Sequence, residues 1–192
     1  MGMPYETGWR AYCPDCKTTN KLLILAFFGS GKSDTLIAWL AWLLGRATVE
    51  GSIPQTGWIS YADDVASRRS KAIRDTIDFN ATYRFVFPDA IPDKKKGWSD
   101  SAWFIQRPDP GKKDPTLVSA GILGGILSNR FPSATIVDDP QDPKQVYSET
   151  YKESTWRTWT DEVSSRGAQD VTPMVVISNR WAEDDLPGRL IA

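Results

Sequence analysis

Residues 26–33 form a glycine-rich segment, Ala-Phe-Phe-Gly-Ser-Gly-Lys-Ser, that ends in a lysine and a hydroxyl side chain. In such a loop the glycines let backbone amides approach an anion, the lysine can reach the β- and γ-phosphates of a nucleotide, and the serine can ligate Mg²⁺. This is the layout of the Walker A phosphate loop, with alanine in place of its first glycine. We therefore expect ATP and Mg²⁺ to bind here. The expected nucleotide-binding residues are Phe28, Gly29, Ser30, Gly31, Lys32, Ser33 and Asp34.

Two adjacent carboxylates, Asp138 and Asp139, follow the apolar run at residues 134–137. In a phosphate-loop enzyme, a carboxylate at the end of a buried strand holds the Mg²⁺ shell, and a second one can orient or polarise the attacking water. We predict that Asp138 and Ser33 ligate the metal, and that Asp139 and Lys32 are catalytic. Many ATPases have glutamate where Asp139 stands, so the water would be positioned slightly differently. The alternative is that both motifs are ordinary polar turns, where such residues are favoured anyway.

The composition of the 192 residues excludes several other chemistries. There is no histidine, which removes His-dependent general-base catalysis, catalytic triads and every His-containing metal site. The cysteines Cys13 and Cys16 supply only half of a four-ligand zinc site, so metal binding and an exposed turn both stay open. The longest apolar stretch is well short of the ~20 residues that span a bilayer, so we expect no membrane contact.

The elements that must position these residues alternate along the chain. An apolar run at 21–27 is typical of a buried strand, and the helix that follows the glycine loop is expected to end at Gly45. Alternating buried strands and helices predict an α/β three-layer domain with a mostly parallel sheet. We expect an N-terminal extension at 1–20 and an ATPase domain at 21–192 with an insertion at 88–115. Further strands are expected at 57–62, 102–106, 134–137 and 174–178, and further helices at 63–79 and 145–164.

Four segments together resemble the ATPase domain of the large terminase subunit of tailed bacteriophages, the motor that packages DNA into capsids. They are the phosphate loop, ISYADDVASRRSKAIRDTI from residue 59, GILGGILSNRFPSATIVDDPQDP from residue 121 and MVVISNRWAEDDLPGRLI from residue 174. Their order and spacing match the family as well. The resemblance covers roughly residues 22–191 and implies a three-layer P-loop NTPase fold of the ASCE type.

The resemblance implies Mg²⁺-dependent ATP hydrolysis that powers translocation of double-stranded DNA into viral procapsids. The implied partners are double-stranded DNA, further copies of the chain in a homo-oligomeric ring on a capsid portal, and a small terminase subunit. The implied location is the cytoplasm of the host cell, as a soluble protein. By resemblance, Asp138 is the Walker B acid and Asp139 stands at the catalytic carboxylate. The implied coupling segment, which relays the state of the γ-phosphate, contains Ser178, Asn179 and Arg180.

The sequence departs from the family pattern in two places. Phe27 and Phe28 stand where family members often carry an arginine within the loop, so positive charge at the γ-phosphate must come from elsewhere. Arg130 is the candidate arginine finger, for its own or a neighbouring subunit, and Arg180 is a second candidate; a solvent-facing loop arginine is the alternative. The chain ends at Ala192, before the C-terminal nuclease that family members carry, so we expect no nuclease activity.

The net charge of −1 gives no global positive field, so any contact with DNA must come from local patches. The basic residues of the helix at 63–79 are one candidate, and a solvated surface is the other reading. Two other functions stay open for the whole chain: a helicase-type ATPase stimulated by nucleic acid, and a non-catalytic nucleotide-binding assembly module. The candidate DNA-contacting residues on that helix are Arg68, Arg69, Lys71 and Arg74.

Overall fold

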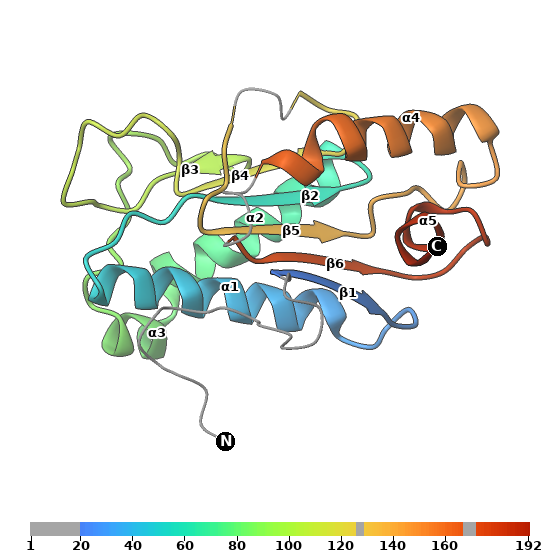
Figure 1. Cartoon of the computed structure of the whole chain (residues 1–192). Helices are drawn as coiled ribbons and strands as arrows, with labels where there is room; N and C mark the ends of the chain where they lie inside the picture. Colours follow the sequence, from blue (N-terminus) through green and yellow to red (C-terminus); the bar gives the residue numbers. More distant parts are fainter. Residues whose placement is uncertain (1–19, 126–128, 167–171) are drawn as a thin grey trace, which may run out of the picture.

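The strands form a single mostly parallel sheet in the computed structural model, which describes residues 20–125, 129–166 and 172–192 (Figure 1). The strand order is β1-β6-β5-β2-β4-β3, and among these strands of the described residues β3 and β4 form the one antiparallel pair. The class predicted from the sequence, α/β with a mostly parallel sheet, is confirmed. The strands are β1 (Lys21–Leu25), β2 (Thr56–Ser60), β3 (Ala102–Trp103), β4 (Leu117–Gly121), β5 (Ala134–Asp138) and β6 (Met174–Ser178).

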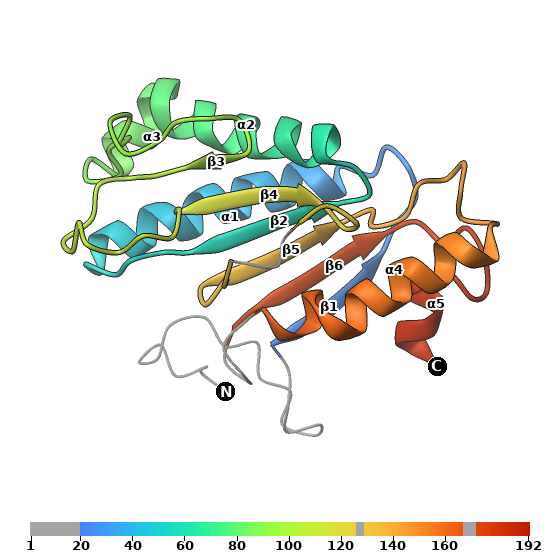
Figure 2. The ribbon, with the colours of Figure 1, turned by 90° about the horizontal axis from the view of Figure 1, so that it is seen from above.

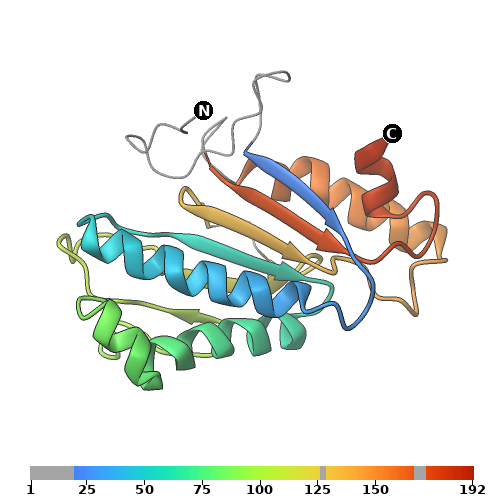
Figure 3. The ribbon, with the colours of Figure 1, turned by 90° about the horizontal axis from the view of Figure 1, so that it is seen from below.

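Helices lie on both faces of this sheet. Figure 2 shows α4 and α5 in front of one face, and Figure 3 shows α1 and α2 across the other, with α3 beside α2. None of the described helices is long and apolar enough to cross a lipid bilayer. The helices are α1 (Lys32–Val49), α2 (Asp63–Phe79), α3 (Ala81–Val86), α4 (Glu149–Asp161) and α5 (Leu186–Ile191), with a 3-10 turn, η2, at Val163–Ser165.

Side chains of the central strands are buried on both faces. Every position of β2, β5 and β6 is buried, so successive residues enter opposite halves of the core. This is why none of these strands alternates regularly between apolar and polar residues, and why β6 begins with four consecutive apolar residues. The half of the core under α1 and α2 includes Trp58, Ile136 and Ile177. The half under α4 and α5 includes Ile59, Val137 and Val176.

Strand β1 differs from its expected burial. It lies at the edge of the described sheet and pairs with β6 alone, and its Leu22 and Leu25 are 50% and 41% exposed. A short apolar run therefore marked a strand correctly but did not reveal its place in the sheet, because an edge strand and a central strand share that pattern.

Several element bounds also differ from expectation. The strand expected at 102–106 keeps only two residues in β3, because Ile105 makes just an isolated bridge with Pro92. The helix expected at 145–164 begins at Glu149, since the Ser148 hydroxyl accepts a hydrogen bond from the Tyr151 amide and caps it. The segment 88–115 supplies β3 to the common sheet. The elements expected at 63–79 and 174–178 occur with those bounds, whereas Cys13 and Cys16 lie outside the described residues.

Helix α1 continues past Gly45, where the sequence predicts its end, and reaches Val49. Gly45 lies inside the helix because the ring of Phe87 packs directly on it. A Cβ atom at this position would lie 2.4 Å from the ring carbon Cγ. The glycine is therefore required by close packing and does not terminate the helix.

Changing Gly45 to alanine should destabilise the protein although alanine is the better helix former. The helix propensity would gain about 1 kcal/mol, but forcing the Phe87 ring aside in a packed core typically costs about 1–3 kcal/mol. Urea unfolding followed by circular dichroism measures the difference. Val49→Ala, at an exposed position of the same helix, serves as the control and should change stability little. A Gly45→Ala protein as stable as wild type would mean that Phe87 can move away freely.

Candidate functional site

The glycine-rich loop at residues 26–33, which is predicted to bind phosphate and is called the phosphate loop below, meets the two carboxylates at the edge of the sheet where the parallel strands end. β6 lies between β1, which leads into the loop, and β5, which ends in Asp138. The Ala26 amide donates to the Ser178 carbonyl (3.2 Å), and the Asp139 amide donates to the Ile177 carbonyl (2.9 Å). Main-chain hydrogen bonds to β6 therefore fix the start of the loop and the carboxylate pair relative to each other.

The backbone of the loop is shaped by two glycines. Gly29 and Gly31 have φ angles of +81° and +76°, in the left-handed region that favours glycine, and Gly31 is the N-cap of α1. The Ser30 amide donates to the Phe27 carbonyl (3.3 Å). The first amides of α1 have no acceptor within the helix, and the helix dipole makes this end positive. Together these features favour an anion such as a phosphate.

Lys32 and Ser33, at the start of α1, each contact one of the carboxylates. The Ser33 hydroxyl donates to Asp138 Oδ1 at 2.9 Å. The Lys32 Nζ atom lies 3.4 Å from Asp139 Oδ2, and the lysine side chain is only 8% exposed. The structure thus brings together four of the predicted site residues from two motifs far apart in sequence. Asp34 is exposed in the first turn of α1.

Asp138 is almost completely buried, with 2% of its side chain exposed. Burial raises the pKa of its carboxyl group, while the hydrogen bond from Ser33 and the positive charges of Arg69 and Lys32 act to lower that pKa. The Ser33 hydroxyl and this carboxylate are hard oxygen ligands that suit Mg²⁺. The described residues contain no group of three or more Asp, Glu, Cys or His side chains that could hold a metal ion. Mg²⁺ commonly uses one or two carboxylates with waters and substrate phosphates, so this ligand set fits it.

Asp139 has an unusual backbone conformation for a residue other than glycine, with φ at +45°. Its neighbours hold it there: its carbonyl accepts from the Tyr61 amide (3.1 Å), and its Oδ1 accepts from the Asn179 amide (3.1 Å). Such conformations persist only where the surroundings enforce them, and they cluster at functional sites. The geometry aims the second oxygen, Oδ2, at Lys32.

Arg69 is a site residue that the sequence reasoning missed, since it was grouped with candidate DNA contacts. Its Nε atom, on α2, lies 3.4 Å from Asp138 Oδ2, and 38% of its side chain is exposed. The helix pattern carries the signal, because Arg69 falls three residues after the buried Ala66 and four residues before the buried Ile73. It therefore faces the sheet and not the solvent side of the helix.

The other three basic residues of α2 have acidic partners, so they do not form a free positive patch. These ion pairs neutralise charge that DNA phosphates would otherwise meet, which weakens the case for this helix as a DNA contact. The pairs are Arg68 with Asp64, Lys71 with Asp75, and Arg74 with Asp100.

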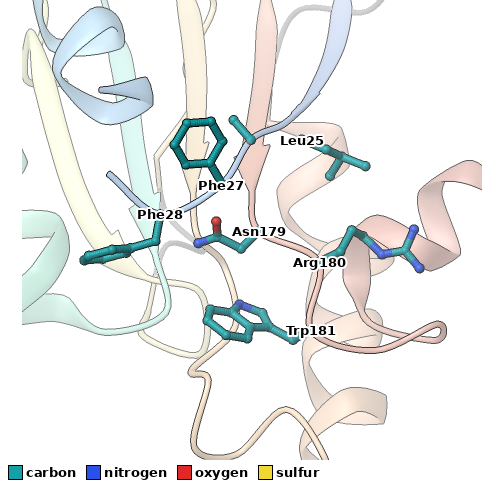
Figure 4. A pocket seen from close by; sticks show the side chains of 7 residues that line it. Leu25, Phe27, Phe28, Asn179, Arg180 and Trp181 are labelled. Carbon is teal, nitrogen blue, oxygen red and sulfur yellow. The ribbon is translucent and has the colours of Figure 1, made fainter. Parts of the chain in front are cut away.

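The expected coupling residues follow the end of β6. Ser178 is buried, and Asn179 donates to Asp139 from its main chain, so both lie against the site. Arg180 instead braces its own loop: Nη2 donates to the Ala182 carbonyl (3.1 Å) and Nε pairs with Asp185 Oδ1 (3.1 Å). In Figure 4 its guanidinium points away from the phenylalanine rings of the phosphate loop. These contacts hold the Arg180 side chain within its own loop, and its coupling role stays a prediction.

An open pocket of about 490 Å³ borders the phosphate loop on the side of Asn179 (Figure 4). Phe27 and Phe28 of the loop are strongly exposed, and Trp181 is partly exposed. Lys32 and Ser33 are not among the residues that line the pocket, so it lies beside their contacts with the carboxylates. The residues that line it are Leu25, Ala26, Phe27, Phe28, Asn179, Arg180 and Trp181.

Arg130, the candidate arginine finger, is exposed and lies in the loop before β5. The adjacent Phe131 amide donates to the Arg166 carbonyl, and the Ser133 amide donates to Gln55, which directly precedes β2. These contacts place the segment at the edge of the sheet where the parallel strands begin. Because Asp138 lies where β5 ends, Arg130 is not brought to the site within its own chain.

Comparison of the sequence with known protein families and with curated proteins found no match. The chemistry of this edge of the sheet is therefore inferred from the side chains themselves. They comprise a glycine loop at a helix N-terminus, a lysine and a serine that start the helix, and two carboxylates that end a neighbouring strand.

Proposed function

We propose that this chain is a Mg²⁺-dependent ATPase whose hydrolysis drives double-stranded DNA into viral procapsids, as the large terminase subunit does. The observation that carries the ATPase part is the pair of contacts from Ser33 to Asp138 (2.9 Å) and from Lys32 to Asp139 (3.4 Å). A phosphate-binding loop without a nearby carboxylate would lack the groups for hydrolysis. Here both are held by elements of one sheet.

The strand order supports the P-loop NTPase class. β1 and β5, which carry the loop and the carboxylates, are separated by β6. The ASCE type is named for an additional strand between these two and for a catalytic glutamate, at whose position this chain has Asp139. The residue that directly follows this strand, Asn179, donates its main-chain amide to Asp139 Oδ1. This hydrogen bond links the end of β6 to Asp139, the residue proposed to orient the attacking water.

The proposed roles follow from the contacts. The loop amides and Lys32 would bind the phosphates, and Lys32 would leave Asp139 to do so. Ser33 and Asp138 would hold Mg²⁺, which neutralises phosphate charge when bound. Asp139, freed at Oδ2 and fixed at Oδ1 by Asn179, would orient the attacking water and accept its proton.

The proposed coupling to DNA rests on the resemblance of four segments to the terminase ATPase domain. A translocating motor grips the phosphate backbone without reading bases, so dispersed basic side chains suffice. A homo-oligomeric ring on a capsid portal, with a small terminase subunit, belongs to this part of the proposal. The host cytoplasm is the corresponding location.

Phosphate release from ATP with Mg²⁺, measured with and without double-stranded DNA, tests both parts. We expect turnover that requires Mg²⁺ and rises with double-stranded DNA. Stimulation by single-stranded DNA in preference to duplex would favour a helicase-type ATPase instead. Tight ATP binding without turnover, at any protein concentration and with DNA, would contradict the proposal and favour a nucleotide-binding assembly module.

A further inference from the structure

Four charged side chains at the site form two ion pairs. Asp139 pairs with Lys32, and Asp138 pairs with Arg69, each at 3.4 Å. The first pair links a carboxylate to the residue proposed to bind phosphate. The second pair links the proposed metal ligand to an arginine of α2 that has no role in the proposed reaction. The formal charges of these four groups cancel.

The pair of Arg69 with Asp138 is a loose contact. The Arg69 Nε atom is buried and makes no hydrogen bond of good geometry within the described residues, although Asp138 lies at ion-pair distance. Ser33 already occupies the other carboxylate oxygen, Oδ1. Arg69 therefore stands at Oδ2, which is the oxygen left for a further cationic partner. With 38% of its side chain exposed, it has room to move away.

We propose that Arg69 is a built-in counter-ion for the metal position, which pairs with Asp138 when no divalent cation is bound and is displaced when one binds. The proposal rests on the proposed function in one respect, that Asp138 is the metal ligand. A buried carboxylate is costly to leave without a positive partner. Arg69 lowers that cost in the absence of metal, and it makes a free divalent cation compete with a guanidinium for the same oxygen.

The competition can be measured with Mn²⁺ alone, without nucleotide, by electron paramagnetic resonance of the free ion. Removing the competing charge with Arg69→Gln should tighten Mn²⁺ binding, by about fivefold for a partly exposed ion pair. Arg68→Gln is the matched control, because it removes the same charge from the same helix at a side chain that pairs with Asp64. Arg69→Lys keeps the charge and should bind Mn²⁺ much as wild type does.

Two further variants connect the effect to Asp138: Asp138→Asn alone, and Asp138→Asn combined with Arg69→Gln. These two should bind Mn²⁺ with equal affinity, because the competition requires that carboxylate. The proposal is overturned if Arg69→Gln binds Mn²⁺ no more tightly than Arg68→Gln. It is also overturned if the double variant binds Mn²⁺ more tightly than Asp138→Asn alone. ATP titrations of wild type then test the proposed function separately from the proposed role of Arg69. Absence of ATP binding would contradict the proposed function, while the Mn²⁺ comparison would still decide the role of Arg69.

Discussion

Lys32→Ala is expected to abolish ATP turnover and to weaken ATP binding by about 100-fold. The lysine is almost fully buried at the start of α1 and is the side chain expected to meet the β- and γ-phosphates. Truncating one partner of a buried charged contact costs roughly 2–5 kcal/mol, and each 1.4 kcal/mol is a tenfold loss of affinity. Isothermal titration with ATP and a phosphate-release assay measure the two effects.

Lys94→Ala is a suitable control for this change. Lys94 is an exposed lysine that pairs with Asp78 (2.7 Å), so its removal also breaks one ion pair. Both variants should keep the circular dichroism spectrum of wild type, and only Lys32→Ala should lose ATP. If Lys32→Ala bound ATP with wild-type affinity, the glycine loop would not be a phosphate-binding loop.

Asp139→Asn should separate binding from hydrolysis. Asparagine tolerates the left-handed backbone that Asp139 adopts, and its Oδ1 can still accept from the Asn179 amide. The substitution removes the negative charge beside Lys32 and the group that would accept a proton from water. We expect ATP affinity to stay within a few-fold of wild type while turnover falls by about 10²–10⁴, the usual contribution of a general base.

Single-turnover hydrolysis with radiolabelled ATP measures this loss directly. Asp142→Asn is the matched control, because Asp142 lies shortly after the pair and accepts hydrogen bonds within its own turn, from the Lys144 amide and the Gln145 side chain. It should hydrolyse ATP at the wild-type rate. Turnover by Asp139→Asn within tenfold of wild type would remove Asp139 from the catalytic role.

The local elements of the site could be predicted because their signals are contiguous in sequence. The glycine loop, the helix after it and the apolar run before Asp138 each combine a residue type with a neighbouring pattern. The expectation that Ser33 and Asp138 converge needed only one more rule, that parallel strands end at a common edge of the sheet. The contact of 2.9 Å between them is what that rule leads one to expect.

Features that depend on distant packing were not predictable in this way. Gly45 looks like a helix terminator in sequence, yet the ring of Phe87 explains it only once both are placed. In sequence, Arg69 looks like one of several surface cations. Only the packing of α2 against β4 and β2 brings Arg69 near Asp138. Arg130 lies in a loop whose sequence gives no sign of its direction, so its position at the end of the sheet where the parallel strands begin could not be predicted.

The pairing of β1 with β6 has a consequence for biosynthesis. These neighbours are the first and last strands of the described sheet in sequence, so β1 gains its strand partner only after residues 174–178 have left the ribosome. Contacts between segments so far apart in sequence form slowly, because the entropy cost of closing a long loop comes before the contacts can stabilise the fold. The phosphate loop directly follows β1, so its position is fixed only when β1 pairs with β6. A nascent chain should therefore acquire nucleotide affinity late, after α1 and α2 can already fold locally. ATP would thus stabilise only chains in which the sheet is complete, because only these could bind it.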